Sequence, residues 1–160
     1  MRKLKMKKSG FTLMEILVVI AMIGILATII MGTYLTSLKR GRDNRRKQDL
    51  EQVGRALELY YAQNNTYPTM EEVIWGSPLY NPADNTRFYM KQLPVDPSDP
   101  DGDTYNYYYN SSELDSYQSY QLYSCLENER DSSYQEYVAD CGIGCGNKCY
   151  YGIASPNSTP

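Results

Sequence analysis

The chain has 160 residues, a formal net charge of −3 and no histidine. Without histidine, Ser-His-Asp and Cys-His catalysis and histidine-bearing zinc sites are excluded. The length suits one globular domain plus an anchor, and seventeen tyrosines and eleven glycines with a single tryptophan indicate a loop-rich domain, not a cofactor enzyme.

The N-terminal segment combines a basic leader with a long apolar run. Residues 1–10, MRKLKMKKSG, hold five basic residues and no acid, and residues 16–38 carry no charge. As a helix rising about 1.5 Å per residue, the apolar run is long enough to cross a bilayer core of about 30 Å. Glu15 stands at its head, where a charge is costly and usually functional. Two plainer interpretations are a simple membrane anchor and a secretory signal cut after Ala27 or Gly32.

The leader changes to the apolar run between Gly10 and Phe11, and the text GFTLME that follows closely resembles the type IV prepilin signature. The resemblance implies that a membrane-embedded prepilin peptidase cuts after Gly10 and that Phe11 becomes a methylated N-terminus. It also implies that Glu15 pairs with the terminal amine of a neighbouring subunit during assembly. Physical chemistry agrees, because a lone carboxylate in lipid needs a partner and an ammonium group is a suitable one.

Helical periodicity continues beyond the apolar run, which predicts one helix from about Thr12 to Gln63. Its second half has an apolar stripe made of Leu50, Val53, Leu57 and Tyr61. The opposite, polar face consists of Asp49, Glu51, Arg55 and Glu58. Pro68 prevents the helix from resuming, and the apolar stripe requires a sheet to cover it.

Charge is distributed unevenly along the chain. Residues 39–47 hold six basic residues and one acid, whereas residues 48–160 hold 5 basic and 17 acidic residues, a net of −12. This acidic head argues against binding of nucleic acid. The basic stretch suits anionic lipid headgroups or the acidic heads of neighbouring subunits, and an ordinary solvated helix face is the alternative. Four cysteines favour an oxidising compartment for the head, with the leader left in the cytoplasm.

A second resemblance lies in the head. Residues 93–97 read LPVDP and residues 98–109 read SDPDGDTYNYYY, in which turn signals precede a tyrosine-rich strand over Thr104–Asn110. This arrangement resembles the major pseudopilins of type II secretion systems, over residues 1–68 and 88–126. The resemblance implies an α+β pilin-like roll, with the long helix packed on a small antiparallel sheet.

The sequence predicts a short helix over 70–75, a loop around Pro78 and Pro82, further strands over 117–126 and 134–140, and an irregular closing segment over 151–157.

Four carboxylates gather in one turn-rich segment: Asp96, Asp99, Asp101 and Asp103. Alternating carboxylates around a glycine can supply oxygen ligands to calcium, and a solvated acidic turn is the alternative. Major pseudopilins bind calcium, but their ligands cannot be matched residue by residue here. Use of these aspartates in a hydrolytic active site is a further, weaker interpretation.

Four cysteines lie in the last quarter of the chain: Cys125, Cys141, Cys145 and Cys149. Three full pairings are possible, and the glycines between the last three cysteines favour a loop tied by disulfides to the strand that bears Cys125. A zinc site made of four thiolates is the alternative, although it lacks the usual C-x2-C spacing.

The sequence therefore predicts a structural subunit and not an enzyme. The expected parts are a removed leader (1–10), a transmembrane assembly half of the helix (11–38), an amphipathic half (39–64) and an acidic head (65–160). The resemblance implies as partners prepilin peptidase, further copies of the chain, other pilin-like subunits, an inner-membrane assembly platform and lipid. The predicted location is a single-pass inner-membrane protein with its head outside the cytoplasm, and then a periplasmic or extracellular filament. The rival interpretation is an anchored calcium-binding adhesive or secreted module that does not polymerise.

Overall fold

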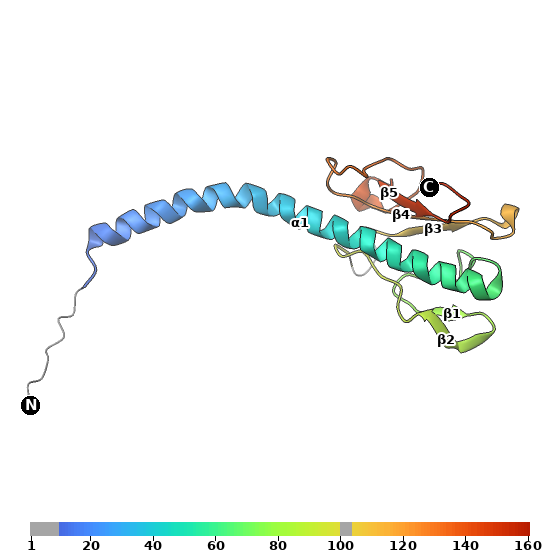
Figure 1. Cartoon of the computed structure of the whole chain (residues 1–160). Coiled ribbons are helices and arrows are strands. Elements are labelled where there is room, and N and C mark those ends of the chain that lie inside the picture. Colours follow the sequence, from blue (N-terminus) through green and yellow to red (C-terminus); the bar gives the residue numbers. More distant parts are fainter. Residues whose placement is uncertain (1–9, 100–103) are drawn as a thin grey trace, which may run out of the picture. The chain divides into compact units, whose positions relative to one another are not determined.

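A computed structural model describes residues 10–99 and 104–160, with only the backbone for residues 29, 30 and 85. The longest element, α1, is an α-helix over Leu13–Asn64 that confirms the predicted long helix to within one residue at each end (Figure 1). The chain forms two compact units, residues 1–38 and residues 39–160. No single straight helix in the described chain is long and apolar enough to cross a membrane, but residues 13–28 and 31–64, joined by a bend, could by length and composition alone.

The second half of α1 buries most of the predicted stripe. Leu50, Val53 and Leu57 are completely buried, and Tyr61 is half-buried. Asp49, expected on the polar face, is also buried, and the hydroxyl of Tyr107 donates a hydrogen bond of 2.8 Å to its carboxylate. Burial raises the pKa of Asp49, and this hydrogen bond opposes the rise. The apolar stripe was therefore predicted correctly, but the buried face is wider than the stripe.

Helix α1 ends at a left-handed residue. Asn65 has a φ of 58°, and its backbone N–H donates to the carbonyl of Tyr61 at 2.8 Å. Asparagine tolerates this conformation better than most residues, which makes it a suitable helix terminator.

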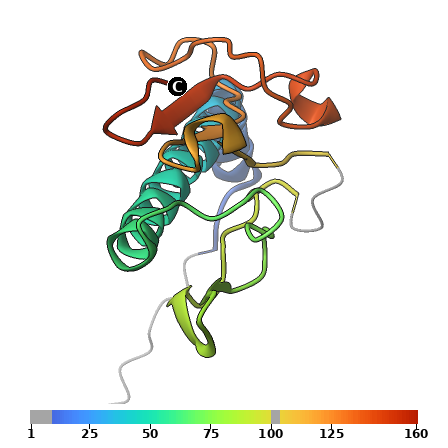
Figure 2. The same ribbon diagram turned by 90° about the vertical axis from the view of Figure 1, so that its right-hand side faces the viewer.

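The head contains two antiparallel sheets, one on each of two sides of α1 (Figures 1 and 2). One is a hairpin of β1 (Leu79–Asn81) and β2 (Asp84–Met90). The other has the order β3-β4-β5 and is formed by β3 (Tyr108–Ser111), β4 (Tyr120–Ser124) and β5 (Tyr151–Ala154). Two 3-10 turns, η1 (Glu113–Asp115) and η2 (Ile143–Cys145), complete the described elements. The predicted α+β class is confirmed.

Several predicted head elements were wrong in detail. Residues 70–75 form turns and not a helix, and the expected loop at residues 78–82 begins the β1–β2 hairpin. Strands β3 and β4 are shorter than predicted. The expected strand over 134–140 is reduced to a single bridge between Tyr137 and Cys149, and the segment expected to be irregular contains β5. β5 forms because its backbone pairs with β4, which supplies hydrogen bonds that side-chain patterning does not reveal.

The main core lies between α1 and the sheets and is rich in tyrosine. Tyr109 and Ser111 both donate hydrogen bonds from their hydroxyl groups to the carbonyl of Pro68, at 2.7 and 2.9 Å. These bonds satisfy polar atoms that would otherwise be costly to bury. A glycine on the helix, Gly54, permits close approach, since a Cβ there would lie 3.1 Å from the hydroxyl of Tyr120. The helix and the sheet are thus fitted closely at this position.

Two disulfides tie down the C-terminal part of the head. Cys125 bonds to Cys145, and Cys141 bonds to Cys149. The prediction of disulfides in this region is confirmed, and the structure selects one of the three possible pairings. All four cysteines join Tyr123 in a second, smaller core.

Candidate assembly site

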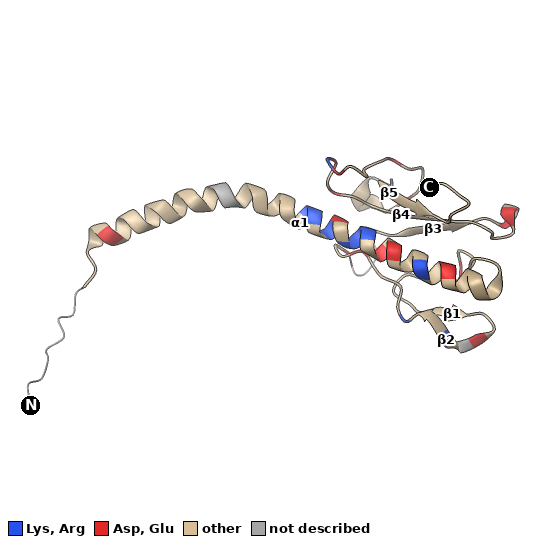
Figure 3. Ribbon diagram, in the orientation of Figure 1, with Lys and Arg blue, Asp and Glu red and all other residues tan. Residues whose placement is uncertain are grey.

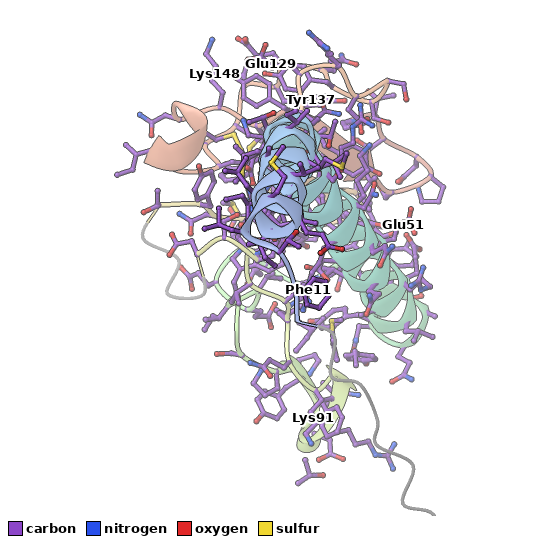
Figure 4. All side chains as sticks on the ribbon, turned by 90° about the vertical axis from the view of Figure 1, so that its left-hand side faces the viewer. Phe11, Glu51, Lys91, Glu129, Tyr137 and Lys148 are labelled. Atoms are coloured by element: carbon purple, nitrogen blue, oxygen red, sulfur yellow. A yellow bond between two sulfur atoms is a disulfide. The ribbon has the colours of Figure 1, made fainter. Side chains whose placement is uncertain are left out.

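The predicted processing residues lie at the exposed start of α1. Gly10 and Phe11 precede the helix, and the Phe11 side chain is 81 % exposed (Figure 4). Thr12 caps the helix: the Glu15 backbone N–H donates to the Thr12 hydroxyl oxygen at 3.2 Å, and the Thr12 backbone N–H donates to the Glu15 carboxylate at 3.3 Å. This reciprocal arrangement is a capping box, which satisfies free N–H groups at the start of a helix. Glu15 is therefore oriented toward the N-terminal end of α1.

The first half of α1 exposes its apolar side chains. The large apolar side chains that the structure describes in this half are each at least 41 % exposed, and they are Leu13, Met14, Ile16, Leu17, Val18, Val19, Ile20, Met22, Ile23, Ile25, Leu26, Met31, Tyr34, Leu35 and Leu38. Glu15 is the one charged residue in the sequence of residues 13–38, a part of α1 that Figure 3 draws mostly in tan. A continuous exposed apolar surface of this kind marks a segment that is covered by lipid or by another protein chain.

Charged residues gather on α1 just beyond the apolar half (Figure 3), and one of them is completely buried. The Arg46 guanidinium donates two hydrogen bonds to Asp96, at 2.7 and 2.9 Å, and one to Asp43 at 2.8 Å. It also donates to Glu127 at 2.9 Å and to the Ser98 hydroxyl at 2.9 Å. Burial lowers the pKa of Arg46, but the hydrogen bonds and charges of Asp96 and Glu127 outweigh it and raise the pKa. A buried charge with this many partners fixes the helix against two separate segments of the head.

The segment around Glu127 completes this cluster. Glu127 accepts a second set of hydrogen bonds from Arg42, including one of 2.7 Å from Nε. The hydrogen bond from Arg42 and the contacts with Arg46 outweigh burial and lower the pKa of Glu127 to about 2. The backbone N–H groups of Glu127 and Asn128 donate to the two carboxylate oxygens of Asp43, each at 2.9 Å. Asp43, the one acid in the basic stretch, is thus used to hold a loop and not to interact with solvent.

The rest of the basic stretch divides between pairing and exposure. Lys47 forms an ion pair with Asp131, and the hydrogen bond from Lys47 lowers the pKa of this aspartate. Lys39, Arg40 and Arg45 are exposed. The prediction that this stretch interacts with lipid or with neighbouring subunits therefore applies to these three residues, and it stays a prediction.

The proposed calcium ligands are brought together only in part. Both carboxylate oxygens of Asp96 are bonded to Arg46, and Asp99 accepts hydrogen bonds from the backbone N–H groups of Thr104 and Tyr105. Asp101 and Asp103 lie outside the described residues. Among the residues that the structure does describe, no group of three acidic or cysteine side chains is placed to hold a metal ion. Calcium binding stays an untested prediction, but Asp96 has a different role in the structure described here.

Comparison with known proteins places these features in a family. Residues 5–31 match the prokaryotic N-terminal methylation motif. Residues 33–137 match the model of type II secretion system protein G, which covers more than half of the chain. The chain belongs to the type II secretion system protein G family.

Curated relatives agree with this assignment. The chain is 34 % identical over 97 residues to the type II secretion system core protein G of Pseudomonas aeruginosa, which covers 57 % of this chain and 68 % of the relative. It is 32 % identical over 102 residues to that of Vibrio cholerae, covering 61 % of this chain and 69 % of the relative. No solved structure matches the chain significantly.

The prepilin motif was identified from the sequence, but two parts of the site were not. These are the capping box, which has a local sequence signal, and the burial of Arg46, which has none. The capping box was visible as a threonine followed three residues later by a glutamate, at Thr12 and Glu15. The burial of Arg46 had no such local signal, because its partners Asp96 and Glu127 lie 50 and 81 residues away in the sequence.

Proposed function

We propose that this chain is a structural subunit of a type II secretion pseudopilus that prepilin peptidase cuts between Gly10 and Phe11. The observation that carries this proposal is the combination of three features in one chain. A methylation motif comes first, an exposed apolar helix half follows it, and the head then matches protein G. The function is structural, and the chemistry is performed on the chain by its processing enzymes.

Assembly follows from the two properties of the N-terminal half. Contacts of the exposed apolar side chains with neighbouring copies keep these side chains out of water once the subunit leaves the membrane. The carboxylate of Glu15 sets the register by pairing with the Phe11 amine of a neighbour, because a charge transferred into an apolar filament core requires an opposite charge. Before assembly, the same apolar half holds the subunit in the inner membrane with its head outside the cytoplasm.

The partners of this subunit are then prepilin peptidase, further copies of the chain, other pilin-like subunits, the inner-membrane assembly platform and membrane lipid. The exposed Lys39, Arg40 and Arg45 are placed directly after the apolar half, where they suit anionic headgroups.

Intact-mass measurement after co-expression with a prepilin peptidase tests the proposal. The expected product lacks residues 1–10 and carries one added methyl group on Phe11. Gly10→Leu should block cleavage, whereas Gly41→Leu, a matched change at an exposed helical glycine with open space around it, should leave cleavage intact. An uncut wild-type chain, or a cut after Ala27, would overturn the proposal.

A further inference from the structure

The C-terminal part of the head builds a cover over the sheet face that points away from α1. We define this cystine cover as residues 125–150, which contain both disulfides. Because side chains alternate along a strand, Leu122 of β4 packs in the main core while its neighbour Tyr123 packs beneath the cover. The family match ends at residue 137, so the second half of the cover lies beyond the region shared with protein G.

An open surface cavity with a volume of about 440 Å³ lies at the edge of the cystine cover. This volume lies within the range of small-molecule sites, about 300–1,000 Å³. Figure 4 labels Tyr137 and Lys148 on the C-terminal segment that carries the cover. The side chains that line this cavity include Tyr108, Tyr137, Glu136, Asp140, Asn147 and Lys148.

Two tyrosine rings that line the cavity are held in place by contacts with a third, buried tyrosine ring. Tyr108 and Tyr137 both contact the ring of the buried Tyr123, with centroids 6.2 and 5.1 Å apart. The Tyr137 backbone N–H also donates to the carbonyl of Cys149 at 2.9 Å, and Cys149 is fixed by its disulfide to Cys141. Aromatic surfaces that are fixed before binding lose little conformational entropy when a ligand arrives.

The polar groups of the cavity include both donors and acceptors. Lys148 forms an ion pair of 2.7 Å with Glu136, so its charge is already balanced. The Asp140 carboxylate accepts a hydrogen bond from the Gly142 N–H, and the Asn147 side chain is exposed beside it. The lining therefore has a slight excess of negative charge, within a region that already carries 17 acidic and 5 basic residues. Anionic ligands are disfavoured by this charge, and the carboxylate, amide and ammonium groups beside the tyrosines can pair with the hydroxyl groups of a neutral polar ligand.

We propose that this cavity binds a neutral saccharide. Pyranose rings present C–H groups that pack on aromatic faces, here Tyr108 and Tyr137. Their hydroxyl groups act as both donor and acceptor, which matches a carboxylate such as Asp140 and an amide such as Asn147. This site is independent of the apolar helix half and goes beyond the structural function proposed above.

Binding of neutral trisaccharides to the full chain tests this proposal. The chain is placed in lipid nanodiscs without glycolipid or glycosidic detergent, and maltotriose, cellotriose and chitotriose are titrated with saturation-transfer NMR as the readout. We expect saturable binding of at least one trisaccharide. Tyr137→Ala and Asn147→Gly should each weaken that binding about tenfold, the change that corresponds to one lost stacking or hydrogen-bonding contact.

The variants are chosen to separate binding from folding. Glycine at position 147 keeps the left-handed backbone, where Asn147 has a φ of 57°, and it removes only the amide. Tyr80→Ala is the matched control, because Tyr80 is an exposed tyrosine of the head that does not line this cavity. It should leave saccharide binding unchanged.

Three results would overturn the proposal. The first is the absence of saturation by all three trisaccharides at about 10 mM, a concentration above that of most weak specific sites. The second is binding that Asn147→Gly and Tyr137→Ala both leave intact. The third is binding that Tyr80→Ala weakens as much as Tyr137→Ala does, since Tyr80 does not line the cavity.

Discussion

The two halves of α1 share one secondary structure but differ in what covers them. Residues 13–38 expose apolar side chains on every side, whereas residues 43–64 bury one face against the sheets of their own head. Helix propensity therefore does not distinguish the halves; their burial does. We expect changes in the first half to affect assembly and leave the head stable, and changes in the second half to do the reverse.

The largest effect is expected at Glu15. Glu15→Ala should abolish filament assembly, because no carboxylate remains to pair with the incoming amine, while membrane insertion and cleavage persist. Electron microscopy of sheared cells and the mass of the membrane-bound product measure the two outcomes. Glu51→Ala, at an exposed glutamate of the second half, is the control and should still give filaments. Normal filaments formed by the Glu15→Ala variant would contradict the proposed pairing of Glu15 with the amine of a neighbouring subunit.

In the second half, the largest effect on stability is expected at Arg46. Arg46→Leu leaves Asp96 and Asp43 buried without their partner, which should lower the free energy of unfolding by about 3–5 kcal/mol. Urea unfolding of the full chain, followed by fluorescence of Trp75, measures this change, since Trp75 packs on the core residue Tyr107.

Arg45→Leu is the matched control for the Arg46 variant. Arg45 is the exposed neighbour of Arg46 on the same helix turn, and its substitution should change stability by less than about 0.5 kcal/mol. Equal effects of the two substitutions would show that the buried cluster does not hold the helix to the head.

Acid should weaken the same cluster through Glu127. Its folded-state pKa of about 2 lies below its ordinary value of 4.5, so its contribution is complete above about pH 4.5 and disappears as the pH falls toward 2. The loss over this window should be about 3 kcal/mol at most. Glu127→Gln should lower stability at neutral pH and flatten the dependence between pH 4.5 and 2, measured by urea unfolding at each pH. Glu129→Gln, at an exposed position, should keep the wild-type slope; an unchanged slope in Glu127→Gln would contradict the assignment.

An effect on stability similar in size to that of Glu127 is expected from the disulfides. Replacing Cys125 and Cys145 together by alanine should cost about 2–4 kcal/mol, and replacing Cys141 and Cys149 slightly less, because the first pair closes a longer loop. Thermal unfolding with and without reductant measures both. Since all four cysteines are in the head, neither pair of substitutions should affect cleavage after Gly10. A greater loss for the shorter loop would contradict the loop-length argument.

The helix was predictable from sequence because its signals are local. The spacing of Leu50, Val53 and Leu57 indicated the buried face, and Pro68 indicated that the helix does not continue beyond this region. The GFTLME motif likewise indicated a pilin-like protein without any knowledge of the head, and the LPVDP segment of the head indicated a type II secretion pseudopilin.

The sheets and the buried charges were less predictable because they depend on partners distant in the chain. β5 contains a glycine and no fully buried residue, so its pattern resembles a loop until β4 is present beside it. Asp96 resembled a calcium ligand because its sequence neighbours are acidic, yet in the fold its partner is Arg46, 50 residues away. Cysteine spacing indicated disulfides but left three pairings open, and only the fold selects among them.

The position of the buried cluster has a mechanical consequence. In a filament whose subunits are held by their apolar halves, tension reaches each head through α1, and residues 42–47 are the first part of the helix to pair with it. Several charge-assisted bonds to two different chain segments, around Asp96 and Glu127, then carry the load in parallel, so no single bond must bear all of it. A pulled subunit is therefore expected to detach its head only after these bonds rupture together, and weaker force peaks for Arg46→Leu in single-filament stretching would measure their share.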